Sequence, residues 1–216
     1  MKKLKKFIRL TFWILFIFLC FNSYLVYKVP IKYEYFVDSA VQETDVEKAL
    51  VLAIIKTESK FDRFSVSNKG AVGLMQIMPT TAVHIADKYK LKLEDPTELD
   101  DVYTNIKIGT TYIDELLNRF GSEKLALAAY NGGPKNVQEW VNEGIITKND
   151  TSATPFSETR NYVDKVMRAK ASYKKFLKYN YRVPKFFTDF TIDIFSIGNG
   201  FINKLKDIRK VAEIFR

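Results

Sequence analysis

Between Thr44 and Ala82 the chain reads TDVEKALVLAIIKTESKFDRFSVSNKGAVGLMQIMPTTA. Its first part predicts a helix over 44–59, because Thr44 and Glu47 have the spacing of a capping box. The same segment carries apolar side chains at helical spacing, at Val46, Leu50, Val51, Ile54 and Ile55. We therefore expect this helix to bury its apolar face in the core of a folded domain.

Glu58 interrupts the apolar face of this predicted helix near its C-terminal end. It follows Ile54 by four residues and Val51 by seven, so its side chain points in the same direction as theirs. Burial and the negative end of the helix dipole both disfavour a carboxylate there and raise its pKa. Such an acid keeps its proton near neutral pH and can act as a general acid. Alternatively, Glu58 ends the helix in solvent or pairs with Lys56 or Lys60.

The rest of the middle region also predicts helices. A glycine-containing loop over 67–73 and a short apolar run over 74–78 follow the first helix. Proline, aspartate, serine and glycine signals at helix ends, combined with helical periodicity, predict further helices at about 79–90, 101–120, 123–130, 134–140 and 158–179. We therefore expect a compact, mainly α domain over 44–180.

The net charge of +9 is concentrated at the two ends of the chain. Residues 1–9 contain five cations, whereas residues 10–169 contain 18 basic and 21 acidic residues. A nucleic-acid-binding module needs a basic face on its folded part. The charge distribution therefore argues against a nucleic-acid partner.

Residues 10–27 form an apolar run of 18 residues without a charge. As a helix this run spans about 27 Å, close to the thickness of a bilayer core. The cations at 1–9 predict a cytoplasmic N-terminus, a transmembrane helix at 10–27, a connector at 28–43 and an extracytoplasmic domain. A cleaved signal peptide is the alternative. The basic and aromatic tail at 181–216 could pack on the domain, lie on the membrane or contact an anionic wall polymer.

The chain has one cysteine, Cys20, which lies in the apolar run, and one histidine, His84. These counts argue against a disulfide framework, zinc sites built on cysteines or on two histidines, and histidine-dependent nucleophile triads. We expect neither a metal nor a cofactor. The chemistry should depend on carboxylates, hydroxyls, amides and lysines.

Four blocks of sequence resemble the soluble lytic transglycosylase family and occur in the family's order. They are ESKFD at 58–62, SNKGAVGLMQIMPTTA at 67–82, AAYNGGP at 128–134 and ETRNYV at 158–163. The resemblance covers about 45–175. It implies a lysozyme-like fold of the α+β type, with a minimal β element.

The resemblance also implies the residues of the site. Glu58 would be the only catalytic acid and base, and the saccharide groove would be lined by Ser67, Gln76, Met78, Tyr130, Asn131 and Tyr162. These residue types suit a sugar ligand. An amide both donates to and accepts from an N-acetyl group, a tyrosine offers a hydroxyl and a ring face, and a methionine provides an adaptable apolar wall.

The implied substrate is the glycan strand of peptidoglycan, and the implied reaction is cleavage of the β-1,4 bond between N-acetylmuramic acid and N-acetylglucosamine. Glu58 would protonate the glycosidic oxygen and then accept the proton of the muramoyl 6-hydroxyl, so that a 1,6-anhydro ring closes without water. Most glycosidases use two carboxylates, but only Asp62 lies near Glu58 in the sequence. A goose-type-lysozyme-like hydrolase, in which Asp62 or another acid positions water, is one alternative. A non-catalytic murein-binding module is the other, and the sequence identifies no protein partner.

Overall fold

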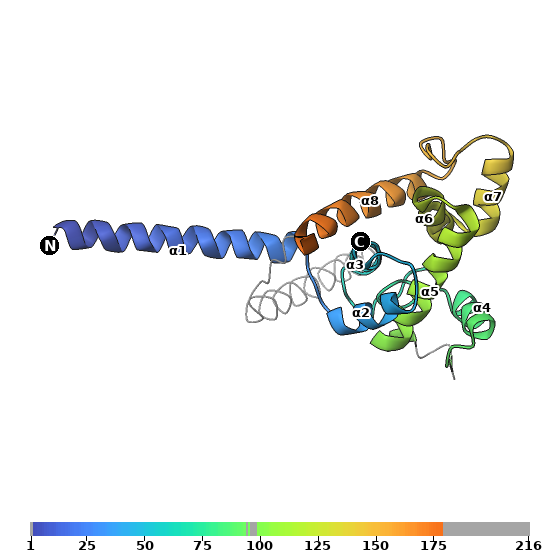
Figure 1. Ribbon diagram of the computed structural model, residues 1–216, viewed down its shortest axis with the longest axis horizontal. Coiled ribbons are helices and arrows are strands. Elements are labelled where there is room, and N and C mark those ends of the chain that lie inside the picture. The colour runs from blue at the N-terminus through green and yellow to red at the C-terminus, as the bar shows by residue number, and fades with distance from the viewer. Residues whose placement is uncertain (1, 94, 96–98, 179–216) are drawn as a thin grey trace, which may run out of the picture. The chain divides into compact units, whose positions relative to one another are not determined.

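The computed structural model describes residues 2–93, 95 and 99–178, which contain eight helices (Figure 1). Their bounds are α1 Lys2–Lys28, α2 Glu34–Gln42, α3 Lys48–Glu58, α4 Pro79–Tyr89, α5 Val102–Phe120, α6 Glu123–Gly132, α7 Pro134–Asn142 and α8 Ser157–Lys178. The mainly α prediction is confirmed. Within the described residues no strand forms, and pairing is limited to isolated bridges of Val72 with Val66 and Ile77. The expected minimal β element is therefore wrong.

Residues Lys32–Tyr179 form one compact unit of the chain, and α1 belongs to another. Among the described residues, no helix combines the length and the apolar character needed to cross a bilayer. The expected transmembrane helix at 10–27 is therefore wrong. Polar side chains interrupt the apolar run within α1: Thr11 donates to the carbonyls of Phe7 and Ile8, and Asn22 donates to that of Phe18.

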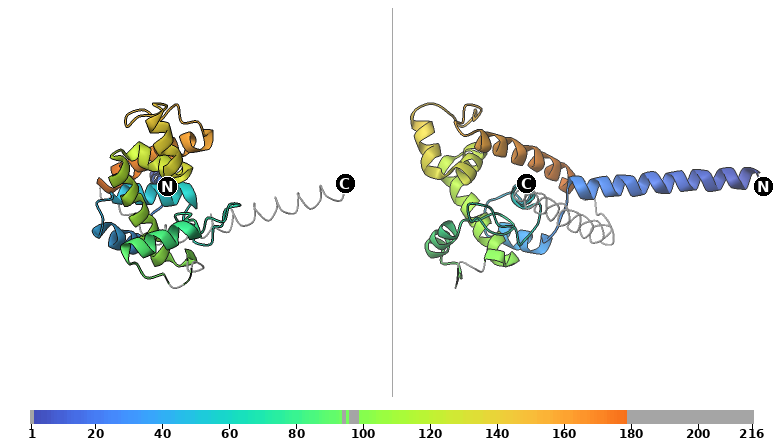
Figure 2. Two further views of the ribbon diagram at one scale, coloured as in Figure 1. Left: turned by 90° about the vertical axis from the view of Figure 1, so that its right-hand side faces the viewer. Right: turned by 180° about the vertical axis from the view of Figure 1, so that it is seen from behind.

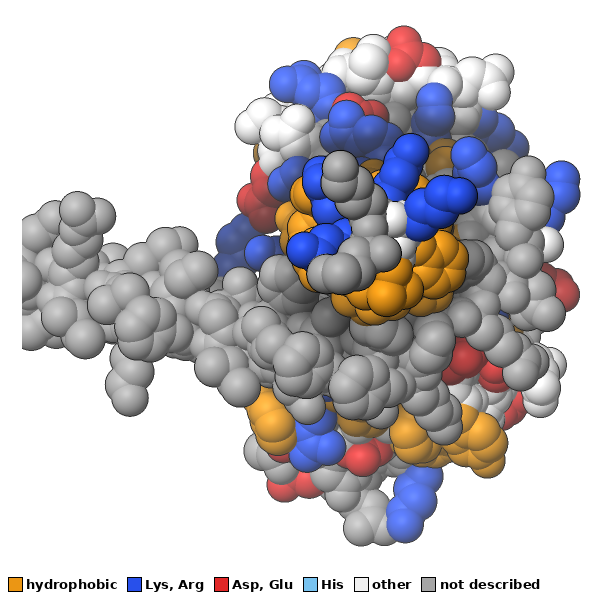
Figure 3. Space-filling view, turned by 90° about the vertical axis from the view of Figure 1, so that its left-hand side faces the viewer, with side chains coloured by type: hydrophobic (Ala, Val, Ile, Leu, Met, Phe, Trp, Pro, Cys, Tyr) orange, Lys and Arg blue, Asp and Glu red, His pale blue; other side chains and the backbone are white. Residues whose placement is uncertain are grey.

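Several exposed side chains of α1 are large and apolar, and residues 1–9 contain the five cations. On the face that Figure 3 shows, hydrophobic side chains lie beside a group of Lys and Arg side chains. The predicted tail at 181–216 lies outside the described residues.

The region expected to be a connector, 28–43, contains the helix α2, which packs against α5 and α3. The predicted capping box does not form. The helix α3 begins at Lys48 after Glu47, which makes no side-chain cap. The Thr44 hydroxyl instead donates to the carbonyl of Ala40 at the end of α2. The Thr44 hydroxyl oxygen also accepts from the Val46 amide at 3.4 Å, so Thr44 lies in the link between the two helices and not at the N-cap of α3.

The helix α3 forms the centre of the domain. All seven residues from Ala49 to Ile55 are buried, so this helix is covered on every side and not on one face only. It packs mainly against α8, and the Lys170 ammonium of α8 pairs with Glu123 at the start of α6 and with Glu47, 3.2 Å away, at the start of α3. The start of α3 is thus tied to both α6 and α8.

Within the unit that contains α3, α2 and α8 pack directly on this helix, and α4 to α7 build the rest of the domain (Figures 1 and 2). The helix α5 packs against α2, α4 and α6, and α6 also packs against α7 and α8. Several of the expected end signals act where the sequence placed them, although Ser122 precedes α6 without a side-chain cap. Asp101 caps α5 by accepting from the Thr104 amide, Gly121 ends it with a φ of 57°, and Pro79 and Pro134 occupy the first turns of α4 and α7.

Candidate active site

Glu58 is the last residue of α3, and its side chain is half-buried. The pKa of its carboxyl is raised from 4.5 to about 7, mainly by burial; the Tyr162 hydroxyl lowers it, and the negative charge of Glu158 contributes to the rise. Near neutral pH a large share of the Glu58 side chains therefore carries a proton. This is the environment that its place on the apolar face predicted.

The chain turns sharply after Glu58. The buried Ser59 hydroxyl lies 3.1 Å from the carbonyl of Ile55 in its own helix and 2.8 Å from the carbonyl of Leu74 in the following loop. Lys60 and Phe61 then adopt positive φ values of 54° and 66°. Two consecutive non-glycine residues in this region are unusual and mark local backbone strain. The end of α3 is thereby tied to the loop that contains Leu74.

Two tyrosines cover the acid from other helices. The rings of Tyr130 in α6 and Tyr162 in α8 are parallel within 2°, with centroids 6.4 Å apart. Burial and the Glu58 charge raise the pKa of both hydroxyls well above the usual value, so both remain protonated. The buried Tyr162 hydroxyl makes no hydrogen bond of ordinary geometry, although it interacts with Glu58. Such loose contacts are common at acids that await a substrate.

Tyr130 is more tightly fixed, because its hydroxyl donates to the carbonyl of Met75 at 2.8 Å. With its single proton engaged, this hydroxyl can only accept a further hydrogen bond. Tyr130 is therefore an acceptor beside Glu58, and Tyr162 is the available donor.

Two of the predicted groove residues hold the loop over 65–78. The Ser67 hydroxyl oxygen accepts from the amides of Lys69 and Ala71, at 3.3 and 3.0 Å. Gln76 has a φ of 49°, and its side-chain nitrogen donates to the carbonyls of Ser65 and Gly73, each at 2.9 Å. The sequence-based expectation that Gln76 both donates to and accepts from a sugar thus needs revision. Its amide nitrogen already donates to backbone carbonyls of the loop, so only its amide oxygen can bind a ligand.

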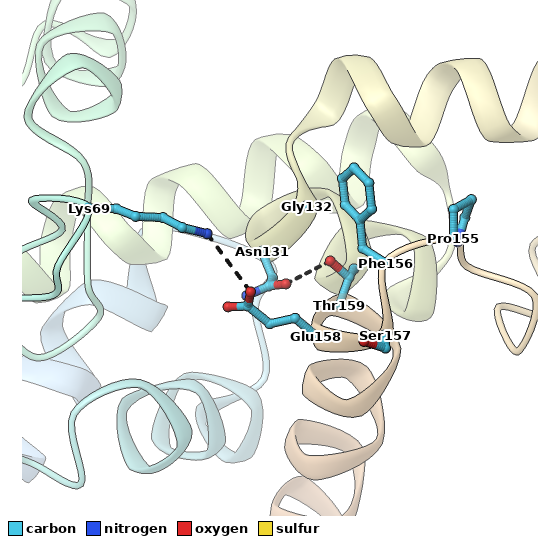
Figure 4. A pocket seen from close by; sticks show the side chains of 8 residues that line it. All are labelled: Lys69, Asn131, Gly132, Pro155, Phe156, Ser157, Glu158 and Thr159. Carbon is cyan, nitrogen blue, oxygen red and sulfur yellow. Dashed lines mark hydrogen bonds and ion pairs between the residues drawn. The ribbon is translucent and has the colours of Figure 1, made fainter.

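The other two predicted groove residues lie at different places in the site. Met78 precedes α4 and is 38% exposed, as an apolar wall requires. Asn131 lines a pocket of about 500 Å³, and its side-chain oxygen accepts from the Thr159 hydroxyl at 2.8 Å (Figure 4).

Figure 4 shows that Lys69 and Glu158 approach each other in this pocket from different segments of the chain. Their charged atoms lie 3.8 Å apart, and the side chains are 82% and 75% exposed. An ion pair this exposed contributes little to stability and can be exchanged for contacts with a ligand. The pocket is close enough to the acid for the Glu158 charge to act on Glu58. Phe156 adds an exposed aromatic ring to the lining.

Asp62, the other acid near Glu58 in the sequence, is exposed and accepts a hydrogen bond from the Phe64 amide at 3.0 Å. Its carboxylate thus accepts a hydrogen bond within the turn that follows α3. Among the described residues, no cluster of three or more histidine, cysteine, aspartate or glutamate side chains is arranged to hold a metal ion.

Sequence reasoning missed several polar residues that support the site. Besides Ser59, these include Asn105, which is buried in α5 and bonded to the loop, and Thr159, which fixes Asn131. An asparagine on the apolar stripe of a helix was the one available signal, because a buried amide needs partners. Nothing in the sequence indicated which partners these are.

Comparisons with known proteins agree with this geometry. Residues 36–151 match the family model described as the transglycosylase SLT domain. A soluble lytic murein transglycosylase of Salmonella typhimurium is 34% identical over 160 residues, which are 72% of this chain and 25% of the relative. A membrane-bound lytic murein transglycosylase C of Yersinia enterocolitica is 33% identical over 168 residues, which cover 67% of this chain and 47% of the relative.

Solved structures show the same likeness. The 70 kDa soluble lytic transglycosylase of Escherichia coli matches with a TM-score of 0.66 and 34% identity, over 71% of this chain and 26% of that chain. The same comparison holds for a 70 kDa soluble lytic transglycosylase in complex with bulgecin A. The present chain spans between about a quarter and about half of the length of these relatives.

Proposed function

This chain belongs to the transglycosylase SLT domain family, and from that premise we propose that it is a peptidoglycan lytic transglycosylase. The proposed substrate is the glycan strand, and the bond cleaved is the β-1,4 bond between N-acetylmuramic acid and N-acetylglucosamine. The observation that carries this proposal is the raised pKa of Glu58, about 7, in a site lined by tyrosines. An acid with this pKa is matched to proton transfer near neutral pH.

The reaction begins with Glu58 in its protonated form. Its proton passes to the glycosidic oxygen, the bond from this oxygen to the muramoyl C1 breaks, and the N-acetylglucosamine hydroxyl leaves. The substrate's N-acetyl group stabilises the cationic muramoyl intermediate. The muramoyl 6-hydroxyl then attacks C1 and gives its proton to the Glu58 carboxylate, which restores the acid. Atoms and protons balance without water, so the product is a 1,6-anhydro ring.

The two tyrosines and the loop make the remaining hydrogen bonds and apolar contacts in the proposed reaction. The Tyr162 hydroxyl donates to the Glu58 carboxylate after proton transfer, and Tyr130 accepts from the protonated acid before it. The Gln76 amide oxygen accepts the N–H of an N-acetyl group, and Met78 packs against the sugar.

The pocket beside the acid holds a further sugar ring. Asn131 and Glu158 supply polar contacts there, and Phe156 supplies a face for stacking. Ser67 contributes by holding the conformation of the loop through the Lys69 and Ala71 amides.

The hydrolase alternative needs a second group to position water. Asp62 is exposed and engaged with the Phe64 amide, and Glu158 is exposed at the pocket rim. Neither has the buried position of a catalytic base, which favours the lyase over a goose-type-lysozyme-like hydrolase.

We place the active chain in the cell envelope, where its proposed substrate lies, and we take the predicted domain at 44–180 together with α2 as the catalytic unit. No cofactor takes part in the proposed reaction, and no nucleic acid is a proposed partner.

Digestion of purified sacculi with the full chain tests the proposal. Mass spectrometry should detect muropeptides with 1,6-anhydro ends, one water lighter than the hydrolysis products. Glu58→Gln should bind sacculi and release nothing, whereas Asp62→Asn, a matched loss of one nearby carboxylate, should release fragments at the wild-type rate.

Each alternative has its own result. Products with hydrated reducing ends from the wild-type chain would establish a hydrolase. Binding of sacculi without release by the wild-type chain would establish a binding module.

A further inference from the structure

One stripe of α5 lies behind the proposed active site without contributing to it directly. Asn105, Gly109 and Tyr112 follow each other at spacings of four and three residues, so they share one face of this helix. We propose that these three are positioning residues that hold Met75 and Tyr130 in place beside Glu58. This inference rests on the proposed function, and none of the three residues touches the reacting atoms.

Asn105 fixes the loop at its backbone. Its side-chain oxygen accepts from the Met75 amide at 2.8 Å, and its nitrogen donates to the carbonyls of Val72 and Leu99, at 3.0 and 2.8 Å. One buried side chain thereby satisfies three backbone groups, two in the loop at 72–75 and one just before α5 at Leu99. Each bond is more valuable in this buried place than at the surface, because its loss would leave an unpaired polar group.

Two glycines make this close contact possible. A Cβ added to Gly73 would lie 2.3 Å from the Asn105 side-chain nitrogen, and one added to Gly109 would lie 2.5 Å from the Met75 sulfur. The loop therefore lies directly on the surface of α5. The Met75 side chain fills the space that Gly109 leaves free.

Tyr112 completes the stripe from the other end. Its ring packs on the ring of Tyr130, with centroids 5.2 Å apart, and the Tyr130 hydroxyl donates to the Met75 carbonyl. Met75 is thus held through its amide by Asn105, through its side chain by Gly109 and through its carbonyl by Tyr130. These contacts form a closed circuit that starts and ends on α5.

The circuit determines what Tyr130 offers to the acid. The Tyr130 hydroxyl donates its hydrogen bond to the Met75 carbonyl. Its oxygen can therefore only accept a hydrogen bond near Glu58. A displaced Met75 or an unsupported Tyr130 ring would turn this hydroxyl away and admit water. Displacements of about 1 Å in a catalytic arrangement lower rates by as much as about a hundredfold.

Tyr112→Leu tests the inference because it removes the ring contact and retains apolar bulk. We expect kcat for anhydromuropeptide release to fall at least about tenfold, with KM within twofold of the wild-type value. Tyr112→Phe keeps the ring and should restore most of kcat. Tyr103→Leu makes the same substitution at an exposed tyrosine of the same helix and should leave kcat unchanged.

The pH dependence distinguishes positioning from a general loss of stability. The titratable groups that face Glu58 are Tyr130 on α6 and Tyr162 and Glu158 on α8, and Tyr112 on α5 supports the first of them. Water admitted by Tyr112→Leu reduces the desolvation of Glu58, so the alkaline limb of kcat should move to lower pH. Circular dichroism over the same pH range measures any unfolded fraction, and a shifted limb in a variant that stays folded at every pH indicates positioning.

Gly109→Ala provides a second, independent variant, since its methyl group displaces Met75 and leaves Tyr112 intact. It should show the same lower kcat and the same shift of the alkaline limb to lower pH. If circular dichroism shows that Tyr112→Leu does not fold, Gly109→Ala tests the positioning role alone. Wild-type kinetics in either folded variant would overturn the positioning role. A wild-type chain without anhydro products would instead overturn the proposed function.

Discussion

Replacing Glu58 by Gln should stabilise the protein, and the gain should depend on pH. Burial raises the pKa of the Glu58 carboxyl from 4.5 to about 7. The folded chain therefore binds this proton more tightly than the unfolded chain. Glu58 costs no stability below pH 4.5, and the cost grows as pH rises toward about 7 and then levels off. The difference between the two pKa values corresponds to about 3 kcal/mol.

Gln has nearly the same shape and never carries the charge, so the variant escapes this cost. We expect its free energy of unfolding to exceed the wild-type value by less than about 1 kcal/mol at pH 5 and by about 3 kcal/mol at pH 8.5. Urea denaturation of both full chains, followed by circular dichroism at several pH values, measures this difference. Asp87→Asn removes an exposed carboxylate of α4 and should show no such trend. A Glu58→Gln difference that stays constant from pH 5 to pH 8.5 would refute the reasoning.

Two further predictions concern the surroundings of the acid. The Tyr162 hydroxyl lowers the pKa of Glu58. Tyr162→Phe should therefore raise that pKa above about 7 and move the alkaline limb of kcat to higher pH. Initial rates from pH 5 to pH 9 measure this shift, and an alkaline limb that does not move would contradict the prediction. Gly73→Ala adds a methyl group 2.3 Å from the Asn105 amide at a φ of 80°, whereas Gly144→Ala meets nothing within 4 Å at a φ of 72°. Thermal melts should show a loss of about 1 kcal/mol for Gly144→Ala and at least about 2 kcal/mol more for Gly73→Ala, and equal losses would mean that the contact with Asn105 is loose.

The helices could be predicted wherever their ends carry a local signal. Asp101 and Gly121 bound α5, and Pro134 begins α7, as their chemistry requires. The helix α2 escaped prediction because it is short and begins after Tyr33, a residue without a capping side chain. Its stability comes from packing on α5 and α3, which a local pattern does not reveal.

The residues of the candidate site could likewise be predicted only where a local sequence feature marks them. Glu58 could be identified because its position on an apolar helix face is a local property. The roles of Ser59, Asn105 and Gln76 depend on backbone groups elsewhere in the chain, up to 33 residues away in the case of Asn105. The loop over 66–77 is held by these side chains and not by a strand ladder, so the expected β element did not form.

The place of Glu58 at the meeting point of distant segments has a consequence for biosynthesis. Its burial depends on Tyr130 and Tyr162, which the ribosome adds 72 and 104 residues later. Until those segments have been made and have folded, Glu58 is an ordinary ionised carboxylate in water and has no proton to give. In the proposed reaction, an unfinished or misfolded copy therefore lacks a protonated acid, and Glu58 gains this property only once α8 has folded.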